Sequence, residues 1–239
     1  MWEYILVFLI IMMGSMIQSA TSFGFGIFVM TLLPWVLNFK EAVIVVVFLA
    51  LLLTLKLAFQ LRTNINFKII IPVIITSFLG RIAGVNILMY LPEDTLKTIF
   101  GFLLIIIALY FILYKNKVKF NPTKTKGGIA GFFSGLLGGA FNSGGPPVVI
   151  YYVNALKEKM TYLSTLQATF AFNCIFTISI HFYYGNINTS ILMYVVSGIF
   201  GVLVGSYLGL IVFKKIPETI LKNIIYGFMI FMGIMLIVK

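Results

Sequence analysis

The stretch Gly127–Tyr151 constrains the fold more than any other part of the sequence, because it is apolar and yet unsuited to a continuous helix. It reads GGIAGFFSGLLGGAFNSGGPPVVIY, with glycine at eight positions and Pro146-Pro147 in its second half. Each glycine costs a helix about 1 kcal/mol relative to alanine, and an interior proline costs more. Broken helices at membrane depth are tolerated only where their backbone is buried in protein or lines a wet cavity. We therefore predict a helix break at Asn142–Gly145 that belongs to a binding site.

The composition places this stretch in a membrane protein. Of the 239 residues, 61% are hydrophobic and 10% are charged, whereas a soluble domain has about 25% charged residues. So few charged side chains could not cover a water-exposed core of this size. We expect an all-α, polytopic integral membrane protein with about eight to ten transmembrane or re-entrant helices.

The apolar segments indicate where those helices lie. They run over 4–20, 25–37, 42–61, 69–91, 95–114, 128–141, 146–156, 160–183, 189–213 and 217–238. A crossing helix needs about 20 residues, so six segments are long enough, whereas 4–20/25–37 and 128–141/146–156 form two short pairs. Glycines interrupt both pairs, the first at Ser22–Gly26. We expect each short pair to return to the side on which it begins.

Four short motifs recur in the same order, which indicates a duplicated unit. The pairs are Lys40-Glu41 with Lys157-Glu158, Asn64-Ile65-Asn66 with Asn186-Ile187-Asn188, Gly80-x-x-x-Gly84 with Gly205-x-x-x-Gly209, and Pro92-Glu93-x-x-Leu96-Lys97 with Pro217-Glu218-x-x-Leu221-Lys222. We predict a first repeat over 1–114, a basic cytoplasmic linker over 115–126 and a second repeat over 127–239. Each repeat would contain a broken helix pair followed by three full helices.

Basic residues orient the repeats, because cytoplasmic loops retain lysine and arginine. The linker carries Lys115, Lys117, Lys119, Lys124 and Lys126. Counting outward from it places Arg62/Lys68, Lys157/Lys159 and Lys214/Lys215 on the same side. Three crossings per unit then make the repeats antiparallel, as in many secondary transporters. We predict a multi-pass protein of the cytoplasmic membrane with both termini outside.

The two helix breaks are the first candidate site. In inverted-repeat transporters, broken helices from both halves meet around the substrate near the bilayer midplane. A helix N-terminus presents free N–H groups and partial positive charge, which suit an anion. The candidate ligands at the breaks are Gln18, Thr21, Ser22, Phe23, Gly24, Gly26, Asn142, Ser143, Gly144 and Gly145. The alternative is close helix packing through small residues.

Arg81 is the second candidate, because it lies about halfway along an apolar segment. A charge at mid-bilayer is costly and is usually functional. No Asp or Glu lies at a comparable depth, so an anionic substrate could supply the opposite charge, which guanidinium binds bidentately. The alternative is an arginine satisfied by backbone carbonyls. We expect His181 to be interfacial, near the outer end of its helix, and we leave Gln167 and Asn173 between helix contacts and cavity lining.

The sequence also argues against several functional classes. It contains no P-loop lysine motif, no HExxH and no cluster of metal ligands. It offers no nucleophile–base pair, so we expect neither an enzyme nor a cofactor or metal site. The lone Cys174 is typical of an apolar filler. The excess of basic residues follows from membrane topology, so we expect a small anion and the lipid bilayer as partners, with a possible homodimer and no nucleic acid.

The chain resembles the TauE/SafE family of membrane proteins, the group of sulfite exporters and toluenesulfonate-uptake permeases. The resemblance covers both halves and rests on Gly14–Gly26, on Gly127–Val149 with Gly144-Gly145-Pro146-Pro147, and on Gly80-x-x-x-Gly84 running into Leu91-Pro92-Glu93 and Leu96–Leu113. It implies transport of small anions such as sulfite, sulfonates or sulfur-containing carboxylates. Two features depart from the family pattern. Gly24-Phe25-Gly26 replaces consecutive glycines, and Arg81 stands where a small residue is expected.

Together these features predict a secondary transporter that exports a small oxyanion by alternating access around a midplane site formed by the two breaks and Arg81. An anion channel of the same architecture is the alternative. A membrane scaffold is disfavoured, because it needs neither broken helices nor a mid-bilayer arginine.

Overall fold

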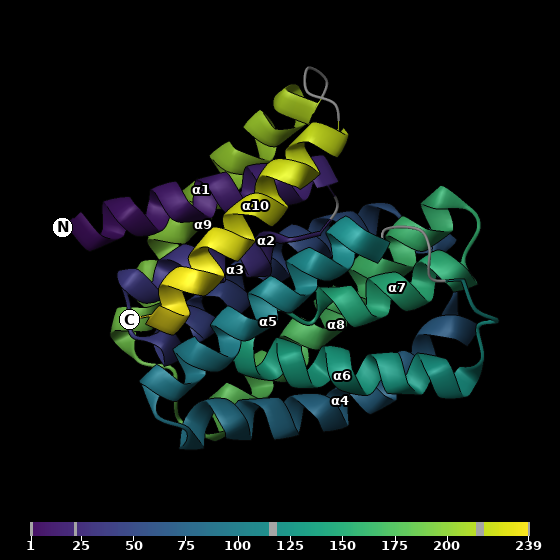
Figure 1. Ribbon diagram of the computed structural model, residues 1–239, viewed down its shortest axis with the longest axis horizontal. Coiled ribbons are helices and arrows are strands. Elements are labelled where there is room, and N and C mark those ends of the chain that lie inside the picture. Colours follow the sequence, from purple (N-terminus) through teal and green to yellow (C-terminus); the bar gives the residue numbers. More distant parts are fainter. Residues whose placement is uncertain (1, 22, 115–118, 214–217, 239) are drawn as a thin grey trace. The chain divides into compact units, whose positions relative to one another are not determined.

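A computed structural model describes residues 2–21, 23–114, 119–213 and 218–238 (Figure 1). The described chain is helical and contains no strand. Its elements are α1 (Trp2–Thr21), α2 (Phe25–Leu32), η1 (Leu33–Trp35), α3 (Phe39–Gln60), η2 (Arg62–Asn64), α4 (Phe67–Tyr90), α5 (Glu93–Tyr114), α6 (Lys124–Phe141), α7 (Gly145–Ala155), α8 (Lys159–Tyr183), α9 (Thr189–Phe213) and α10 (Glu218–Val238). The expected all-α, polytopic membrane fold is confirmed.

One segment differs from the expectation that both members of each broken pair are short. Helix α1 has 20 residues and is one of five described helices that are long and apolar enough to cross a membrane. It is longer than predicted because it begins at Trp2 and continues through Gln18 to Thr21. The expected partner segment is short, since α2 has 8 residues.

The chain divides into two compact units. Unit 1 consists of Met1–Val46, Tyr90–Val118 and Ser190–Lys239, and unit 2 consists of Val47–Met89 and Lys119–Thr189. Each unit therefore contains helices from both predicted repeats. The two compact units do not coincide with the two repeats.

In unit 2, helices α4, α6 and α8 run in the same direction. The α4–α6 contact proceeds from Val73 beside Gly131 to Val85 beside Gly139, and the two ribbons lie side by side in Figure 1. The α4–α8 contact begins where the Asn66 N–H donates to Thr165 and ends where the Tyr184 hydroxyl donates to Asn86.

The starting ends of these three helices therefore share one end of unit 2, and that end is basic. It carries the exposed residues Lys68, Lys124 and Lys159. Helix α7 returns toward this end, since the Tyr151 hydroxyl donates to the Thr123 carbonyl at 3.2 Å. The broken pair α6–α7 is thus a helical hairpin whose two ends lie together.

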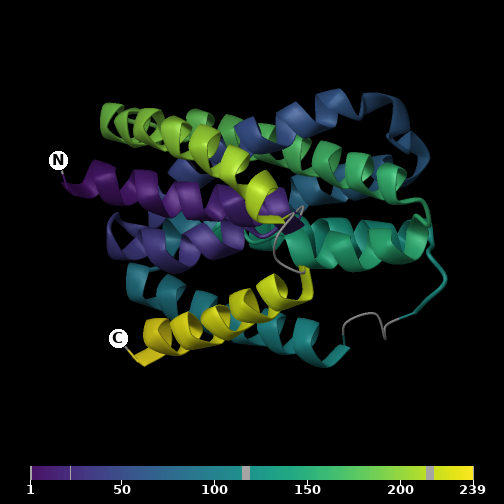
Figure 2. The same ribbon diagram turned by 90° about the horizontal axis from the view of Figure 1, so that it is seen from above.

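Unit 1 repeats the glycine packing of unit 2. Gly80 and Gly84 of α4 lie so close to the Phe132 and Leu136 carbonyls of α6 that a methyl group at either would clash with the backbone. In unit 1, α9 runs parallel to α1, and its corresponding residues meet the α1 backbone in the same way. These are Gly205 against Met12 and Gly209 against Met16. Elsewhere in unit 1, α5 and α10 lie side by side (Figure 2).

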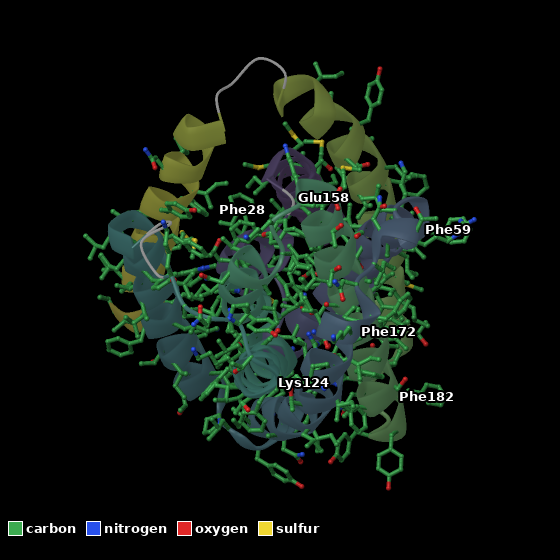
Figure 3. All side chains as sticks on the ribbon, turned by 90° about the vertical axis from the view of Figure 1, so that its right-hand side faces the viewer. Phe28, Phe59, Lys124, Glu158, Phe172 and Phe182 are labelled. Carbon is green, nitrogen blue, oxygen red and sulfur yellow. The ribbon has the colours of Figure 1, made fainter. Side chains whose placement is uncertain are left out.

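The outer faces of unit 2 are apolar, as the bilayer requires. Figure 3 shows Phe182 standing out from α8 and Phe59 from α3, and Phe172, Phe182 and Phe59 are 43%, 77% and 68% exposed. The buried face of α8 is instead polar, with Thr169, Asn173 and other side chains fully enclosed. The interior of unit 2 therefore combines an apolar core with one polar helix face, while large apolar side chains are exposed on its outside.

Candidate functional site

The second helix break lies where the sequence predicts it. Helix α6 ends at Phe141, and Asn142 follows in the left-handed conformation with φ 50°. Asparagine tolerates this conformation better than most residues other than glycine. Helix α7 begins at Gly145, with prolines in its first turn, where their missing N–H groups would be unpaired in any case. The non-helical residues are thus Asn142, Ser143 and Gly144.

Two residues of this break have structural roles. The Ser143 hydroxyl is buried and donates to the Phe141 carbonyl at 3.1 Å. Gly144 lies against the Ser134 backbone of α6, where a methyl group would clash. Both observations favour the packing interpretation for Ser143 and Gly144. Asn142 is different, because its buried Nδ2 has no hydrogen-bond partner among the described residues.

Arg81 is buried inside unit 2, with 4% of its surface exposed. Its Nη1 donates to the Thr177 hydroxyl of α8. The far end of the guanidinium lies in the space that a side chain on Gly138 would occupy. Gly138 is one turn before Asn142, whose N–H donates to the Gly138 carbonyl at 3.0 Å. The side chain of Arg81 is therefore held between α6 and α8, next to the last turn of α6.

Buried polar side chains follow α8 at every fourth residue. They are Thr165, Thr169, Asn173, Thr177 and His181, and none is exposed. Most reach another element. Thr169 bonds to the Tyr152 hydroxyl of α7 at 2.7 Å, Asn173 accepts from Ser77 of α4, and Thr177 accepts from Arg81. This α8 polar stripe connects α8 to the helices around it.

The unpaired polar atoms beside this stripe are mostly donors. Among the described residues, Arg81 Nε, Asn173 Nδ2, Asn142 Nδ2 and the Ser134 hydroxyl are buried without a hydrogen-bond partner. No carboxylate of the described chain pairs with Arg81. Buried polar groups are normally satisfied, and an anion that accepts hydrogen bonds would suit the Arg81 and Asn173 donors of this set.

The first helix break lies in unit 1 and has a different design. Gly24 precedes α2 with φ 104°, a conformation open to glycine and strained for other residues. The Gln18 Oε1 accepts from the Phe25 N–H at 3.3 Å, so Gln18 caps α2. Its Nε2 is buried without a partner in the described chain. Gly26 is a residue of α2, the Thr21 backbone ends α1, and Ser22 lies outside the described residues.

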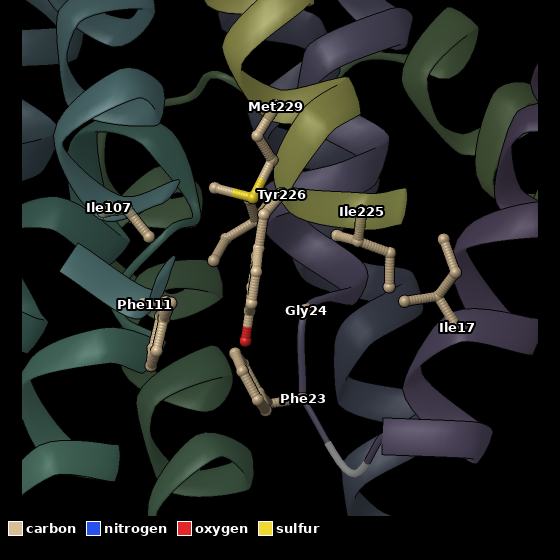
Figure 4. Close-up of a pocket in the computed structure, with 9 residues that line it drawn as sticks. Ile17, Phe23, Gly24, Ile107, Phe111, Ile225, Tyr226 and Met229 are labelled. Carbon is tan, nitrogen blue, oxygen red and sulfur yellow. The ribbon is translucent and has the colours of Figure 1, made fainter. Parts of the chain in front are cut away.

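Phe23 joins an aromatic cluster at this break. Its ring centroid is 5.7 Å from that of Phe111 in α5, which stacks on Tyr226 of α10 at 5.5 Å. These rings and neighbouring aliphatic side chains enclose an apolar cavity of about 20 Å³ (Figure 4). That volume suits at most one water-sized group, and its lining is apolar. The geometry therefore favours a packing role for Phe23.

The structure thus brings together one part of the predicted site. Arg81, Asn142, Ser143, Gly144 and Gly145 all belong to unit 2, whereas Gln18, Phe23, Gly24 and Gly26 belong to unit 1. Sequence reasoning missed Thr177, Ser77 and Ser134. The four-residue spacing of polar side chains along 165–181 was the signal that could have identified Thr177.

His181 lies in the last turn of α8, near the end of its helix as expected. Its side chain is fully buried, and its Nδ1 lies 3.2 Å from the Asn186 amide nitrogen. The four-residue spacing turns it inward with the rest of the α8 polar stripe. Cys174 is buried and free. In the described part of the chain, no three His, Cys, Asp or Glu side chains gather as metal ligands would.

The family model described as "Sulfite exporter TauE/SafE" matches residues 6–236, nearly the whole chain. Comparisons with curated proteins and with solved structures gave no match.

Proposed function

Because this chain belongs to the TauE/SafE family of sulfite exporters, a family of membrane transporters, we propose that it is a secondary transporter that exports a small oxyanion. Sulfite, an organosulfonate or a related carboxylate would be its substrate. The family assignment supports a transporter and not an enzyme. The proposed location is the cytoplasmic membrane, with both termini outside.

The observation that carries this proposal is the buried guanidinium of Arg81, which has no carboxylate partner in the described chain. An uncompensated charge in a protein interior is strongly unfavourable. Its unpaired Nε and the nearby unpaired amide of Asn173 are donors. An oxyanion entering this region would supply both the countercharge and the missing acceptors.

The direction of transport follows from the membrane potential. The buried polar residues of the described chain include no Asp or Glu that could bind a coupling proton. With the interior negative, the potential favours exit of an anion by about 2.3 kcal/mol per charge per 100 mV. Export therefore needs no coupling ion, whereas accumulation of the same anion would need one. Access would alternate as one half of the protein rocks against the other.

The basic end of unit 2 supports the proposed topology. Helices α4, α6 and α8 all begin there, with Lys68, Lys124 and Lys159, and cytoplasmic ends retain such residues. Lys115, Lys117, Lys214 and Lys215, which entered the topology prediction, lie outside the described residues. Under this topology the hairpin α6–α7 enters from the cytoplasm and returns to it.

The first test is a thermal-shift screen of the purified protein against sulfite, sulfate, thiosulfate, sulfonates and carboxylates. We expect at least one anion to raise the Tm of the wild-type protein. Arg81→Met should abolish that rise, because it removes the buried charge. Arg62→Met is the matched control, since Arg62 is exposed and its guanidinium lies over the Phe59 ring. An undiminished shift in Arg81→Met would overturn the role of Arg81.

A flux assay separates the transporter from the alternative, an anion channel. Protein in liposomes should exchange labelled anion faster when unlabelled anion is present on the other side, and transport of the substrate should need no proton gradient. Conductance far above carrier turnover without such stimulation would establish the channel. Flux that appears only under a proton gradient would contradict uncoupled export.

A further inference from the structure

A groove on the outer face of unit 2 lies between α4 and α6 and is independent of the Arg81 region. Its volume is about 620 Å³. The lining consists of Pro72, Ile75 and Thr76 of α4 and of Lys124, Thr125, Gly128, Ile129, Phe132 and Phe133 of α6. Ile75, Ile129 and Phe133 are 60%, 54% and 50% exposed. The groove is thus open and mostly apolar, and it runs along two parallel helices.

Small residues create this groove. Gly128 has no side chain, and a methyl group added there would meet the Thr76 methyl group of α4. Gly131 lies against the Val73 backbone. Pro72 lies within α4 and cannot donate a backbone hydrogen bond. The helices therefore approach closely at their axes, while the bulky side chains on either side form the walls.

One end of the groove is positively charged. Lys124 lines it at the start of α6 and has no hydrogen bond or ion pair with any described residue. Lys68 is exposed one turn before Pro72 on α4, at the same end. The Lys126 side chain already has partners, because its Nζ donates to the Asn121 carbonyl at 3.1 Å and lies over the Phe120 ring. Lys124 is thus the basic residue in the lining of the groove, and the Thr125 hydroxyl beside it is a further donor.

We propose that this groove binds an anionic phospholipid, with an acyl chain between Ile75 and Phe133 and the phosphate at Lys124. The charge distribution selects this occupant. An apolar channel with a cation at its end matches a molecule that is apolar along its length and anionic at one end, and basic pockets between transmembrane helices bind such headgroups. The lipid belongs to the leaflet that holds the starting ends of α4 and α6, which is the cytoplasmic leaflet under the proposed topology.

The test is native mass spectrometry of the intact protein released from detergent, with phosphatidylglycerol and phosphatidylcholine of identical acyl chains supplied in equal amounts. We expect phosphatidylglycerol adducts to predominate. Lys124→Gln should reduce that preference about fivefold, the effect of one lysine near a phosphate. Lys159→Gln is the matched control, an exposed lysine at the same end of unit 2 but outside the groove.

A second variant tests the apolar part. Ile75→Trp fills the groove and should reduce adducts of both lipids, whereas Phe172→Trp, exposed on α8 away from the groove, should leave them unchanged. Equal binding of the two lipids, or wild-type adducts in both Lys124→Gln and Ile75→Trp, would refute the proposal. The proposal would also be refuted if light scattering showed a dimeric wild-type protein and a monomeric Ile75→Trp variant. A second copy of the chain, and not a lipid, would then occupy the groove. Substrate-induced thermal shifts are measured on the same samples, so that a failure here is distinguished from a failure of the transport proposal.

Discussion

At the scale of single residues, the environment of Arg81 depends on complementary sizes on neighbouring helices. The guanidinium occupies space left by Gly138 on α6, and the Thr177 hydroxyl on α8 accepts a hydrogen bond from it. Thr177 is well suited to this task, because its hydroxyl accepts from Arg81 while donating to the Asn173 carbonyl at 3.0 Å. A single hydroxyl therefore holds the arginine at a fixed position along the helix.

Thr177→Val tests this arrangement, because valine keeps the shape of threonine and removes the acceptor. We expect a loss of about 1.5–3 kcal/mol in the free energy of unfolding, the range for a hydrogen bond to a charged group. Equilibrium unfolding in mixed detergent measures it. Thr177→Ser keeps the hydroxyl and should lose much less. If the Thr177→Val and Thr177→Ser variants had the same free energy of unfolding, the hydrogen bond between Arg81 and Thr177 would not contribute to stability.

At the scale of secondary-structure elements, closely packed glycines determine which helices meet. The α4–α6 and α1–α9 contacts are built alike, with glycine at corresponding positions of α4 and α9 against backbone carbonyls of the other helix. Backbone cannot move aside as the end of a flexible side chain can. The hydrophobic effect does not drive helices together in lipid, so close packing of this kind holds them together instead.

Alanine substitutions separate packing from helix propensity. Gly80→Ala and Gly205→Ala should each destabilise by about 1–3 kcal/mol, because the new methyl group overpacks an interface. Gly227→Ala in α10 is the control, since nothing lies within 4 Å of the added atom. There we expect neutrality or a gain of up to about 1 kcal/mol from helix propensity. Thermal unfolding of the three variants gives the comparison. Equal effects at all three positions would contradict the packing argument.

At the scale of the whole molecule, the topology can be tested through residues near the two ends of α4, α6 and α8. In a Cys174→Ala background, single cysteines at Tyr90 and Tyr183, which are 81% and 85% exposed, should react with a membrane-impermeant maleimide added to intact cells. Cysteines at Lys124 and Lys159 should react only after the cells are opened. Labelling of the lysine positions alone from outside would indicate the opposite orientation. Labelling of all four positions from outside would contradict the placement of the two ends on opposite sides of the membrane.

Hydropathy predicted the helix boundaries closely, and the Gly-Gly-Pro-Pro run predicted the second break, because both signals act locally. Arg81 was identifiable for the same reason, since a charge in an apolar run is visible without knowing its neighbours. For Thr177 the sequence offers only the polar spacing along 165–181, because its partner Arg81 lies far away in the chain. The repeated Gly80-x-x-x-Gly84 pattern predicted close packing, but the sequence does not state that its partner is α6.

The glycine packing of unit 1 has a consequence for how the protein is made. Phe8, Met12 and Met16 of α1 are matched by Gly201, Gly205 and Gly209 of α9, and α1 is synthesised before α9. Helix α1 therefore lacks this packing partner until α9 has been translated. Until α9 arrives, the Met12 and Met16 backbone, which is hydrogen-bonded within α1, is open to lipid or to the insertion machinery. Ribosome-stalled chains that end before α9 should consequently leave α1 accessible to crosslinkers, and chains that include α9 should not.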